Sequence, residues 1–595
     1  MNSQIIVFIV IAVTLFLFIY GKLRYDFVAL LGLVILTTTG VVSPEQAFLG
    51  FSHPAVITVA SVLVISSALI KTGAIDRLVT LINRGPDKIY MKIMSLMVIT
   101  AILSAFMNNV GALALILPIG ITIARDNDVP PSQLLMPVAF ASLLGGMMTG
   151  IGTPPNLIIS TYRIQAGGEA FSFFSFAPVG VTLTILGILF TVFIGWRLIP
   201  RRDSDKIKDI FNLEDYLFEL VVTDGCKVGG MTLKEFHKEY KVSINVLSIV
   251  RKNSRIISPG GNQKMLPGDI LIVKAVSKNL KDIVSKTCLQ LKGAKTDKLV
   301  SEGLLKSDDI ALVEVVLRDD SPLVGRTAFE TRLRNQYNAN LIAVSRKGVS
   351  NINRLKYFEF NRGDVLLLQV PKASLSYTYS KMRCLPLAER GVDINIEASM
   401  KDQYLTLGIF VLSILASTFE IFPVQISFSF AALLLVILNV VSPREFYEAI
   451  EWPTIIMIGS LFSLGAALQS SGASNTIANG LMVMSNVLTP PFMLGLLMVM
   501  SMILTNLISS TATTILMGPI AISLAVSMGV SIDPLLMAVG VGASSAFLTP
   551  IAHQSNMLVM GPGGYRFTDY WHLGLPLSII SLVVGVPAIL FVWPL

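Results

Sequence analysis

The sequence predicts an α-helical, multi-pass membrane protein with two related halves and a polar insert between them. Of its 595 residues, 53% are hydrophobic and only 14% charged, which excludes an ordinary soluble globular protein. Residues 1–200 and 403–595 are apolar, whereas 201–402 is rich in charged residues. The halves are also related, because residues 41–74 match 440–473 with 11 identities in 34 positions. Such an internal duplication of hydrophobic halves is typical of secondary transporters.

Each half contains apolar segments that are long enough, or nearly so, to cross a bilayer. The uninterrupted segments are 4–21, 27–42, 54–71, 172–199, 403–421, 426–441, 454–470 and 574–592. Four further segments are interrupted by small polar residues, Gly, Pro or Asn. We expect re-entrant hairpins at 91–125 and 486–528, and spanning helices broken in the middle at 133–162 and 533–562. Irregular backbone at membrane depth persists only where protein or a water-filled cavity satisfies it.

The number of crossings predicts the relation between the halves. Each half crosses five times, an odd number, so the two repeats (1–200 and 403–595) are inverted if the insert stays on one side. Thirteen basic residues of the short loops fall on the side of the insert, and Arg163 is the exception. By the positive-inside rule, we expect an inner or plasma membrane protein with 201–402 cytoplasmic and both termini outside.

The insert carries a weaker duplication of its own, at an offset of 95 residues. The repeated features are a short strand followed by a basic residue and a Gly-Asp turn: Asn245–Leu247, Arg251 and Gly268-Asp269, then Asn340–Ile342, Arg346 and Gly363-Asp364. A helix over Thr232–Tyr240 and alternating strands complete a small α+β module. We expect a linker at 201–209 and two tandem modules at 210–290 and 308–390.

The composition of the insert limits its chemistry. No GxGxxG follows a strand, so dinucleotide binding is not predicted. The three cysteines, Cys226, Cys288 and Cys384, lack CxxC spacing. They predict a reduced compartment without a disulfide or zinc framework.

Both hairpins carry small polar residues at the tip, Asn108-Asn109-Val110 in the first and Ser509-Ser510-Thr511 in the second. The unpaired N–H groups of a returning half-helix attract an anion. Carbonyls at the end of the entering half-helix can bind a small cation such as Na⁺. Small residues also suit close helix packing, which is the alternative interpretation. Their occurrence at matched positions of a duplicated chain favours a binding site.

The broken helices carry a matched pair of motifs, Gly152-Thr153-Pro154-Pro155-Asn156 and Ala552-His553-Gln554-Ser555-Asn556. The two prolines stop the helix and free carbonyls beside Gly152. Asn156 and Asn556 would satisfy unwound backbone or face the cavity. His553 is either a proton-coupling or substrate-binding group or a structural histidine. Because no Lys or Arg lies at this predicted site, hydroxyls, amides, backbone N–H groups and helix ends would hold an anion beside a cation.

At these residues the chain resembles the divalent anion–sodium symporter family. Members carry Ser-Asn-Thr at both tips, Thr-Pro-Pro-Asn or Ser-Pro-Pro-Asn at the breaks, and a hydroxyl residue four positions before each tip, here Ser104 and Thr505. The resemblance implies two sodium sites, one from Ser104, Asn109 and Gly152, the other from Thr505, Ser510 and Ala552. It also implies a homodimer that works by an elevator-type movement.

The insert resembles the C-terminal regulator (RCK-C) module of Trk-type potassium transport proteins. This resemblance implies gating by an unidentified regulatory ligand, and a purely structural insert is the alternative. Family members that combine such modules with this membrane unit resemble sulfate permeases. Val110, Ser510 and His553-Gln554-Ser555 depart from the family pattern, which weighs against a dicarboxylate substrate.

The expected function is therefore Na⁺-coupled uptake of a divalent inorganic anion, with sulfate as the first choice. Protons are the alternative coupling ion, and dicarboxylate or citrate is the alternative substrate. The residues expected to face the substrate are Asn108, Asn109, Thr153, Ser509, Ser510, Thr511 and His553, with Pro154, Pro155, Asn156 and Asn556 supporting the breaks.

Functions of other classes have less support in the sequence. A ligand-gated cation channel would need a TVGYG-like filter, which is absent. A metal-efflux or Na⁺/H⁺ exchange carrier would need more buried carboxylates. We find no constellation for an enzyme, an organic cofactor or nucleic-acid binding.

Overall fold

The fold was analysed in a computed structural model. It describes residues 3–20, 23–74, 88–127, 129–201, 217–223, 226, 228–240, 245–251, 254–257, 259–274, 289–291, 310–318, 321–346, 349–351, 358–371, 374–389, 400–485 and 489–595. The predicted linker at 201–209, apart from its first residue, and Cys288 lie outside these ranges. So do the first three residues of the second predicted hairpin.

The described part of the first half is mostly helical, and every predicted apolar span coincides with a helix. Its elements are α1 (Ser3–Tyr20), α2 (Tyr25–Thr38), α3 (Pro44–Ala47), η1 (Leu49–Ser52), α4 (Pro54–Lys71), α6 (Ile89–Phe106), α7 (Asn109–Asp126), α8 (Ser132–Gly146), α9 (Pro154–Gln165), α10 (Ala177–Phe193) and η3 (Gly195–Arg197). The tip at Asn108 separates α6 from α7, and the Pro-Pro motif begins α9. Proline is tolerated at this point because the first N–H groups of a helix have no partner within it.

The second half repeats this order of elements. Its helices are α16 (Met400–Thr418), α17 (Val424–Ile437), α18 (Pro443–Ala449), α19 (Trp452–Ser470), α20 (Ala473–Ser485), α21 (Pro490–Thr505), α22 (Ser510–Met528), α23 (Ile532–Ser544), α24 (Gln554–Met560), η7 (Phe567–Asp569) and α25 (Tyr570–Val592). The sequence analysis did not predict α20. Six candidate spans of the described chain are long and apolar enough to cross a bilayer, and seven apolar helices are shorter. The prediction of a mostly helical, multi-pass membrane protein is confirmed.

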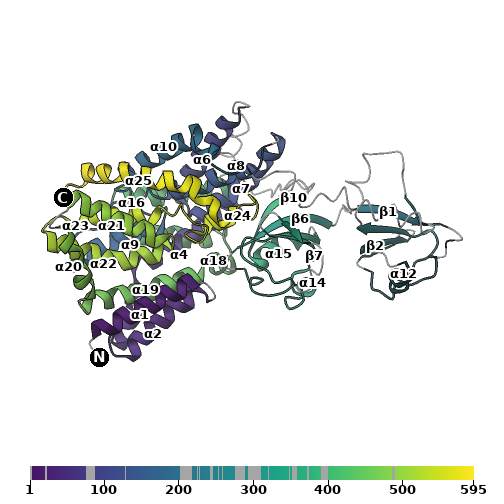
Figure 1. Ribbon diagram of the computed structural model, residues 1–595, viewed down its shortest axis with the longest axis horizontal. Helices are drawn as coiled ribbons and strands as arrows, with labels where there is room; N and C mark the ends of the chain where they lie inside the picture. The colour runs from purple at the N-terminus through teal and green to yellow at the C-terminus, as the bar shows by residue number, and fades with distance from the viewer. Residues whose placement is uncertain are drawn as a thin grey trace.

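The halves are interlocked through their broken helices. Helix α9 packs against α22 and α23 of the other half: the Tyr162 hydroxyl donates to the Ile515 carbonyl at 2.8 Å, and Arg163 pairs with Asp533 at 2.8 Å. In return, α24 packs on α7 and α8, and the buried Tyr565 hydroxyl accepts from the Met136 N–H at 2.8 Å. Residues from both repeats therefore share one core (Figure 1).

The insert forms two five-stranded antiparallel sheets of the same topology, ordered β3-β2-β4-β1-β5 and β10-β6-β9-β7-β8. The first contains β1 (Leu217–Val222), β2 (Asn245–Arg251), β3 (Ser254–Ile257), β4 (Ile270–Lys274) and β5 (Leu289–Leu291), with helix α12 (Leu233–Tyr240). The second contains β6 (Ile310–Leu317), β7 (Asn340–Arg346), β8 (Val349–Asn351), β9 (Val365–Pro371) and β10 (Cys384–Glu389), with α14 (Leu333–Tyr337) and α15 (Leu375–Met382).

The repeated basic residue and Gly-Asp turn meet in each sheet. Arg251 forms a bidentate ion pair with Asp269, at 2.8 and 2.7 Å, and Arg346 forms the same pair with Asp364 at the same distances. Both carboxylates are 1% exposed, so each pair compensates a buried charge. The preceding glycine of the second turn, Gly363, has φ +73°, a conformation that favours glycine.

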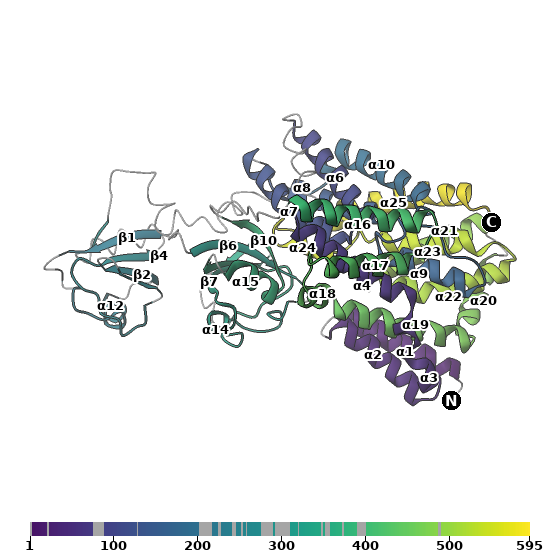
Figure 2. The same cartoon turned by 180° about the vertical axis from the view of Figure 1, so that it is seen from behind.

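The second sheet lies against the end of the helical part where α24 is found, and the first sheet lies beyond it (Figure 2). Val316, Val365 and Leu387 of the second sheet belong to the same hydrophobic core as the apolar helices. One prediction for the insert is wrong, because Cys226 is disulfide-bonded. Cys384 is a free, buried thiol.

Candidate functional site

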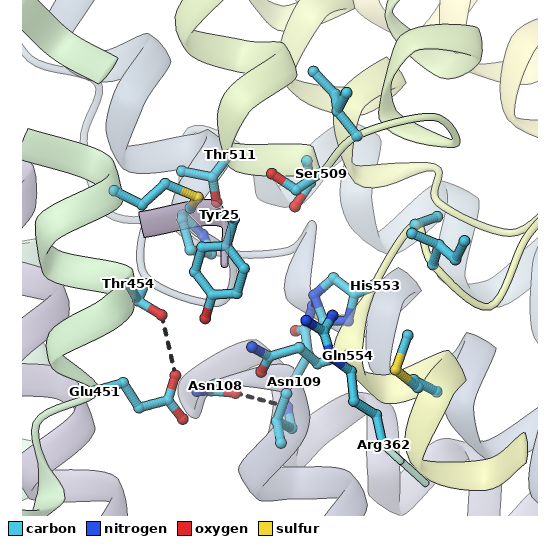
Figure 3. Close-up of a pocket in the computed structure, with 18 of the residues that line it drawn as sticks. Tyr25, Asn108, Asn109, Arg362, Glu451, Thr454, Ser509, Thr511, His553 and Gln554 are labelled. Atoms are coloured by element: carbon cyan, nitrogen blue, oxygen red, sulfur yellow. Dashed lines mark hydrogen bonds between the residues drawn. The ribbon is translucent and has the colours of Figure 1, made fainter. Parts of the chain in front are cut away.

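A cavity of about 890 Å³ opens where the hairpin tips and helix breaks of the two halves meet (Figure 3). The predicted site residues that line it are Asn108, Asn109, Gly152, Pro154, Ser509, Ser510, Thr511, Ala552 and His553. Val110 also lines the cavity. The tips and breaks, which are far apart in sequence, therefore contribute to one pocket.

Side chains cap the returning helix at each tip. The Asn108 Oδ1 atom accepts from the N–H groups of Val110 at 2.6 Å and Gly111 at 3.4 Å, so its amide nitrogen is the group left for the cavity. At the second tip, the Ser509 hydroxyl oxygen accepts from the Ala512 N–H at 3.3 Å. Both caps hold the positive end of a long helix, α7 or α22, beside the cavity.

The two breaks are held by the same hydrogen bonds. The Asn156 Nδ2 atom donates to the carbonyl of Thr149 at 2.7 Å and that of Gly146 at 3.3 Å. At an offset of 400 residues, Asn556 Nδ2 donates to the carbonyls of Thr549, at 3.1 Å, and of Ala546, at 2.7 Å. These amides replace hydrogen bonds that the unwound backbone has lost.

A cluster of oxygen atoms lies beside the first tip. One of the two polar atoms of the Asn109 amide, written Oδ1, is 2.8 Å from the Ser104 hydroxyl, 3.0 Å from the Gly152 carbonyl and 3.2 Å from the Ser142 carbonyl. If the amide is turned over, Nδ2 takes this position. The Ser104 hydroxyl also donates to the Ser142 carbonyl at 2.7 Å. With its amide oxygen inward, Asn109 completes a group of four oxygens suited to a small cation. With its amide nitrogen inward, it satisfies the same oxygens by hydrogen bonding.

His553 connects the second break to this cluster. Its Nδ1 atom accepts from the Ser555 N–H at 3.1 Å, which places the proton of the neutral ring on Nε2. The Nε2 atom lies 3.4 Å from the other polar atom of the Asn109 amide, which is Nδ2 when Oδ1 points to the oxygen cluster. A protonated Nε2 can donate to the amide oxygen of Asn109 but not to its nitrogen. The orientation of Asn109 therefore determines whether His553 has a partner there.

The corresponding cluster in the second half is less complete. The Thr505 hydroxyl donates to the Ala543 carbonyl at 2.8 Å, the same arrangement as Ser104 with Ser142. The Ala552 N–H donates to the Thr549 hydroxyl at 3.2 Å, as Gly152 does to Thr149. Within the described chain, no hydrogen bond joins the Ser510 side chain to these residues.

Several predicted site residues lie behind the cavity wall. Ser104 and Thr505 are 0% exposed and Thr153 is 2% exposed, and none of these three lines the cavity. The break-supporting residues Pro155, Asn156 and Asn556 are likewise buried behind the wall.

Sequence reasoning did not find seven polar residues of the wall: Tyr25, Glu359, Asn361, Arg362, Glu451, Thr454 and Gln554. Six of them come from elements outside the tips and breaks, where no local pattern marks them. Gln554 lies within a motif that was recognised, but it was not assigned to the site. The described residues contain no group of three His, Cys, Asp or Glu suited to a metal ion.

The family model for citrate transporters (CitMHS) matches residues 15–542 of the chain. The chain belongs to the citrate transporter family. An uncharacterized transporter of Synechocystis is 31% identical to it over 581 residues, which cover 96% of this chain and 94% of that protein. An uncharacterized transporter of Escherichia coli is 30% identical over the full length of both chains. The family and these relatives identify a membrane transporter.

More distant relatives carry names that mention an ion and a substrate. A probable sodium/sulfate cotransporter 3 of Chlamydomonas reinhardtii is 20% identical, over 92% of this transporter and 83% of that protein. Sodium/sulfate cotransporter 2 of the same organism is 24% identical over 55% of this chain and 38% of its own.

Proposed function

We propose that this citrate-family transporter couples Na⁺ to the uptake of a divalent inorganic anion, with sulfate as its first substrate. The oxygen cluster at Asn109 carries the proposal, because it borders a cavity between two helix N-termini. The names of the sodium/sulfate cotransporter relatives support the choice of ion and anion. Na⁺ would occupy the cluster of Ser104, Asn109 and Gly152, with Thr505, Ser510 and Ala552 as the proposed second site.

The neighbouring glycines fit a cation at this position. A Cβ atom on Gly152 would lie 2.5 Å from the Gly146 carbonyl, and one on Gly146 would overlap the Asn109 amide. Backbone oxygens can therefore approach closely only because both residues lack side chains. No carboxylate takes part in the cluster, which suits weak, reversible binding of a transported ion.

Asn109 and His553 together offer a mechanism for coupling. Without Na⁺, the Asn109 amide nitrogen points inward and its oxygen accepts from His553 Nε2–H. Bound Na⁺ requires the amide oxygen to point to the oxygen cluster. The Asn109 Nδ2 and His553 Nε2 atoms, 3.4 Å apart, are then both N–H donors and cannot hydrogen bond to each other. Both donors are then released toward the cavity, where an anion can accept from them. Na⁺ binding thus raises anion affinity, and by thermodynamic linkage the anion raises Na⁺ affinity equally.

The tips and breaks would contribute neutral donors to the anion in the cavity. The groups available are the Asn108 amide nitrogen, the hydroxyls of Ser509 and Thr511, and the released donors of Asn109 and His553. Thr153 is not among them, because it lies behind the wall. An oxyanion accepts from amide, hydroxyl and imidazole N–H groups alike.

The larger features of the sequence analysis belong to the same proposal. The two repeats would be inverted and move by an elevator-type mechanism within a homodimer in the inner or plasma membrane. The insert would lie in the cytoplasm, both termini outside, and its RCK-C-like modules at 210–290 and 308–390 would bind a regulatory ligand. The shared core of α9 with α22 and of α24 with α8 suits a transport unit that moves as one body.

The test is uptake of labelled sulfate by purified protein in liposomes under a Na⁺ gradient or a proton gradient. We expect Na⁺-driven uptake that citrate and succinate compete with weakly. Asn109→Ala should raise the Na⁺ requirement, and His553→Ala should weaken anion affinity and change the response to pH. Sulfate uptake that does not depend on Na⁺ would contradict the proposed Na⁺ coupling. A His553→Ala variant with unchanged anion affinity and pH response would contradict the role of His553.

A citrate or dicarboxylate symporter is the second candidate function. The description of the matching family favours it. In the same liposomes, citrate- or succinate-driven currents without sulfate flux would select this function.

A further inference from the structure

The cavity wall includes a cationic side chain that comes from the insert rather than from the apolar helices. Arg362 belongs to the Asn361–Asp364 turn of the second sheet, just before β9, and lines the cavity together with Asn361. Figure 3 shows its side chain directed into the cavity, toward the side where His553 and Gln554 lie. No other Lys or Arg of the described chain lines this cavity.

The turn that carries Arg362 is held rigidly. The Gly363 N–H donates to the Leu317 carbonyl at 2.9 Å, and the Leu317 N–H donates to the Asp364 carbonyl at 2.9 Å. The Asp364 carboxylate accepts from the Asn361 N–H at 2.7 Å and pairs with Arg346. Arg362 is therefore presented from a fixed backbone rather than from a loose loop.

The same turn is packed against the broken helix of the transport site. A Cβ atom on Gly561, just after α24, would overlap the Gly363 carbonyl. A Cβ atom on Gly363 would lie 3.1 Å from the Met557 carbonyl of α24. Beside this contact, Arg318 at the end of β6 pairs with Glu451 at 2.7 Å. These contacts fix the Arg362 turn at the cavity.

Two carboxylates line the same cavity, Glu359 and Glu451, and Glu451 already has a cationic partner. Glu451 is paired with Arg318 and also accepts from the Thr454 hydroxyl at 3.3 Å. The pKa of Arg346 is raised by its hydrogen bond to Asp364, and the negative charge of Glu359 raises it further. Arg362 itself forms no hydrogen bond or ion pair with any described residue. Its guanidinium N–H groups are therefore available as donors to a ligand.

Comparison of the two modules supports a role that is specific to this turn. The first sheet has the equivalent turn, with the same hydrogen bond from the Leu266 N–H to Asp269 at 2.8 Å. At the position equivalent to Arg362, 95 residues earlier, that turn carries Pro267. The turn therefore does not need an arginine to form. The arginine occurs in the copy that faces the cavity.

We propose that Arg362 is a substrate-binding residue, through which the soluble insert supplies the fixed positive charge of the anion cavity. A guanidinium group matches the oxygens of a sulfate or a carboxylate by two parallel hydrogen bonds. The inference rests on the proposed function. It assigns the second sheet a direct part in anion binding at the cavity, in addition to any regulatory role.

The experiment compares Arg362→Gln, Arg362→Lys and Arg326→Gln. Arg326 is an exposed arginine between β6 and α14 that does not line the cavity. In liposomes, Arg362→Gln should raise the KM for the transported anion about tenfold, the effect expected for one lost charge-assisted interaction. Arg362→Lys should give a smaller increase in KM, because lysine keeps the charge but cannot form the two parallel hydrogen bonds of a guanidinium group. Arg326→Gln should leave KM unchanged.

A positioning variant and a folding control complete the test. Gly561→Ala keeps Arg362 but displaces its turn, so it should raise the anion KM in the same direction. Thermal unfolding in detergent, with and without sulfate, should show that the Arg362 variants fold and that only the anion-induced stabilisation is reduced. If the wild type transports an anion that Arg362→Gln handles with the same KM, this inference alone is overturned. If the wild type neither transports nor binds sulfate, succinate or citrate, the proposed function is overturned together with it.

Discussion

The glycines around Asn109 give a sharp test of the sodium site. In Gly146→Ala, the new Cβ atom would overlap the Asn109 amide oxygen and lie 3.2 Å from its Cγ and Nδ2 atoms, whereas ordinary contacts begin at 3.4 Å. The clash is with a side chain rather than with the backbone, so the amide can move away. Moving it breaks its contacts with Ser104 and Gly152.

The expected effect is large for sodium and moderate for stability. Losing one interaction to a charged ligand corresponds to about 1.5 to 3 kcal/mol, or roughly a 10- to 100-fold rise in the KM for Na⁺. Overpacking of this kind costs about 1 to 3 kcal/mol of stability. The assay is sulfate uptake at varied external Na⁺, with thermal unfolding in detergent measured in parallel.

Gly150→Ala is the matched control. It lies in the same break, but its Cβ atom would meet nothing closer than 3.6 Å, so the Na⁺ requirement should not change. By contrast, a Cβ atom on Gly145 would overlap the backbone of Ala101, so Gly145→Ala should impair folding instead. A Gly146→Ala protein that folds and keeps the wild-type Na⁺ requirement would refute the assignment of this cluster to Na⁺.

Four further predictions concern stability and reactivity. Arg346→Leu leaves the buried Asp364 carboxylate unpaired and should destabilise the second sheet by about 2 to 3 kcal/mol, seen as earlier proteolysis of the insert; unchanged proteolysis would contradict this. Burial raises the pKa of Cys384 to about 12, so a maleimide at pH 8 should label it only after denaturation. For the same reason the stability of that sheet should fall as pH rises from about 9 toward 12, because the unfolded thiol releases its proton first; a flat profile there would be the adverse result. Asn156→Ala removes the donor to Thr149 and should cost about 2 to 4 kcal/mol in thermal unfolding, with transport lost; a variant that unfolds and transports like wild type would contradict the role of the amide.

Local patterns predicted the helical part well because each signal acts within one segment. The prolines at Pro154 and Pro155 cannot continue a helix, and α9 begins at Pro154. Asn108 has a short side chain that can accept from the N–H groups after it, and it caps α7 in that way. In the insert, the two sheets share one topology.

Predictions that depended on more than one segment were less complete. Thr153 was expected to face the substrate, but it is buried behind the wall while His553, at the equivalent position, lines the cavity. The two breaks face different neighbours, and a sequence pattern does not record which. Cys226 was expected to be unpaired for a similar reason, because its spacing from the other cysteines says nothing of their distance in space.

By itself, the sequence determined the class of this protein, its two related halves, the places where its helices break and the polar groups at those breaks. These follow from hydropathy and backbone chemistry, which act over a few neighbouring residues. Only the tertiary structure brought Asn109 within 3.4 Å of His553 and placed Arg362 of the insert in the wall of a membrane cavity. Those contacts join residues that are between about 190 and 450 positions apart, and such pairs are chosen by the packing of whole elements.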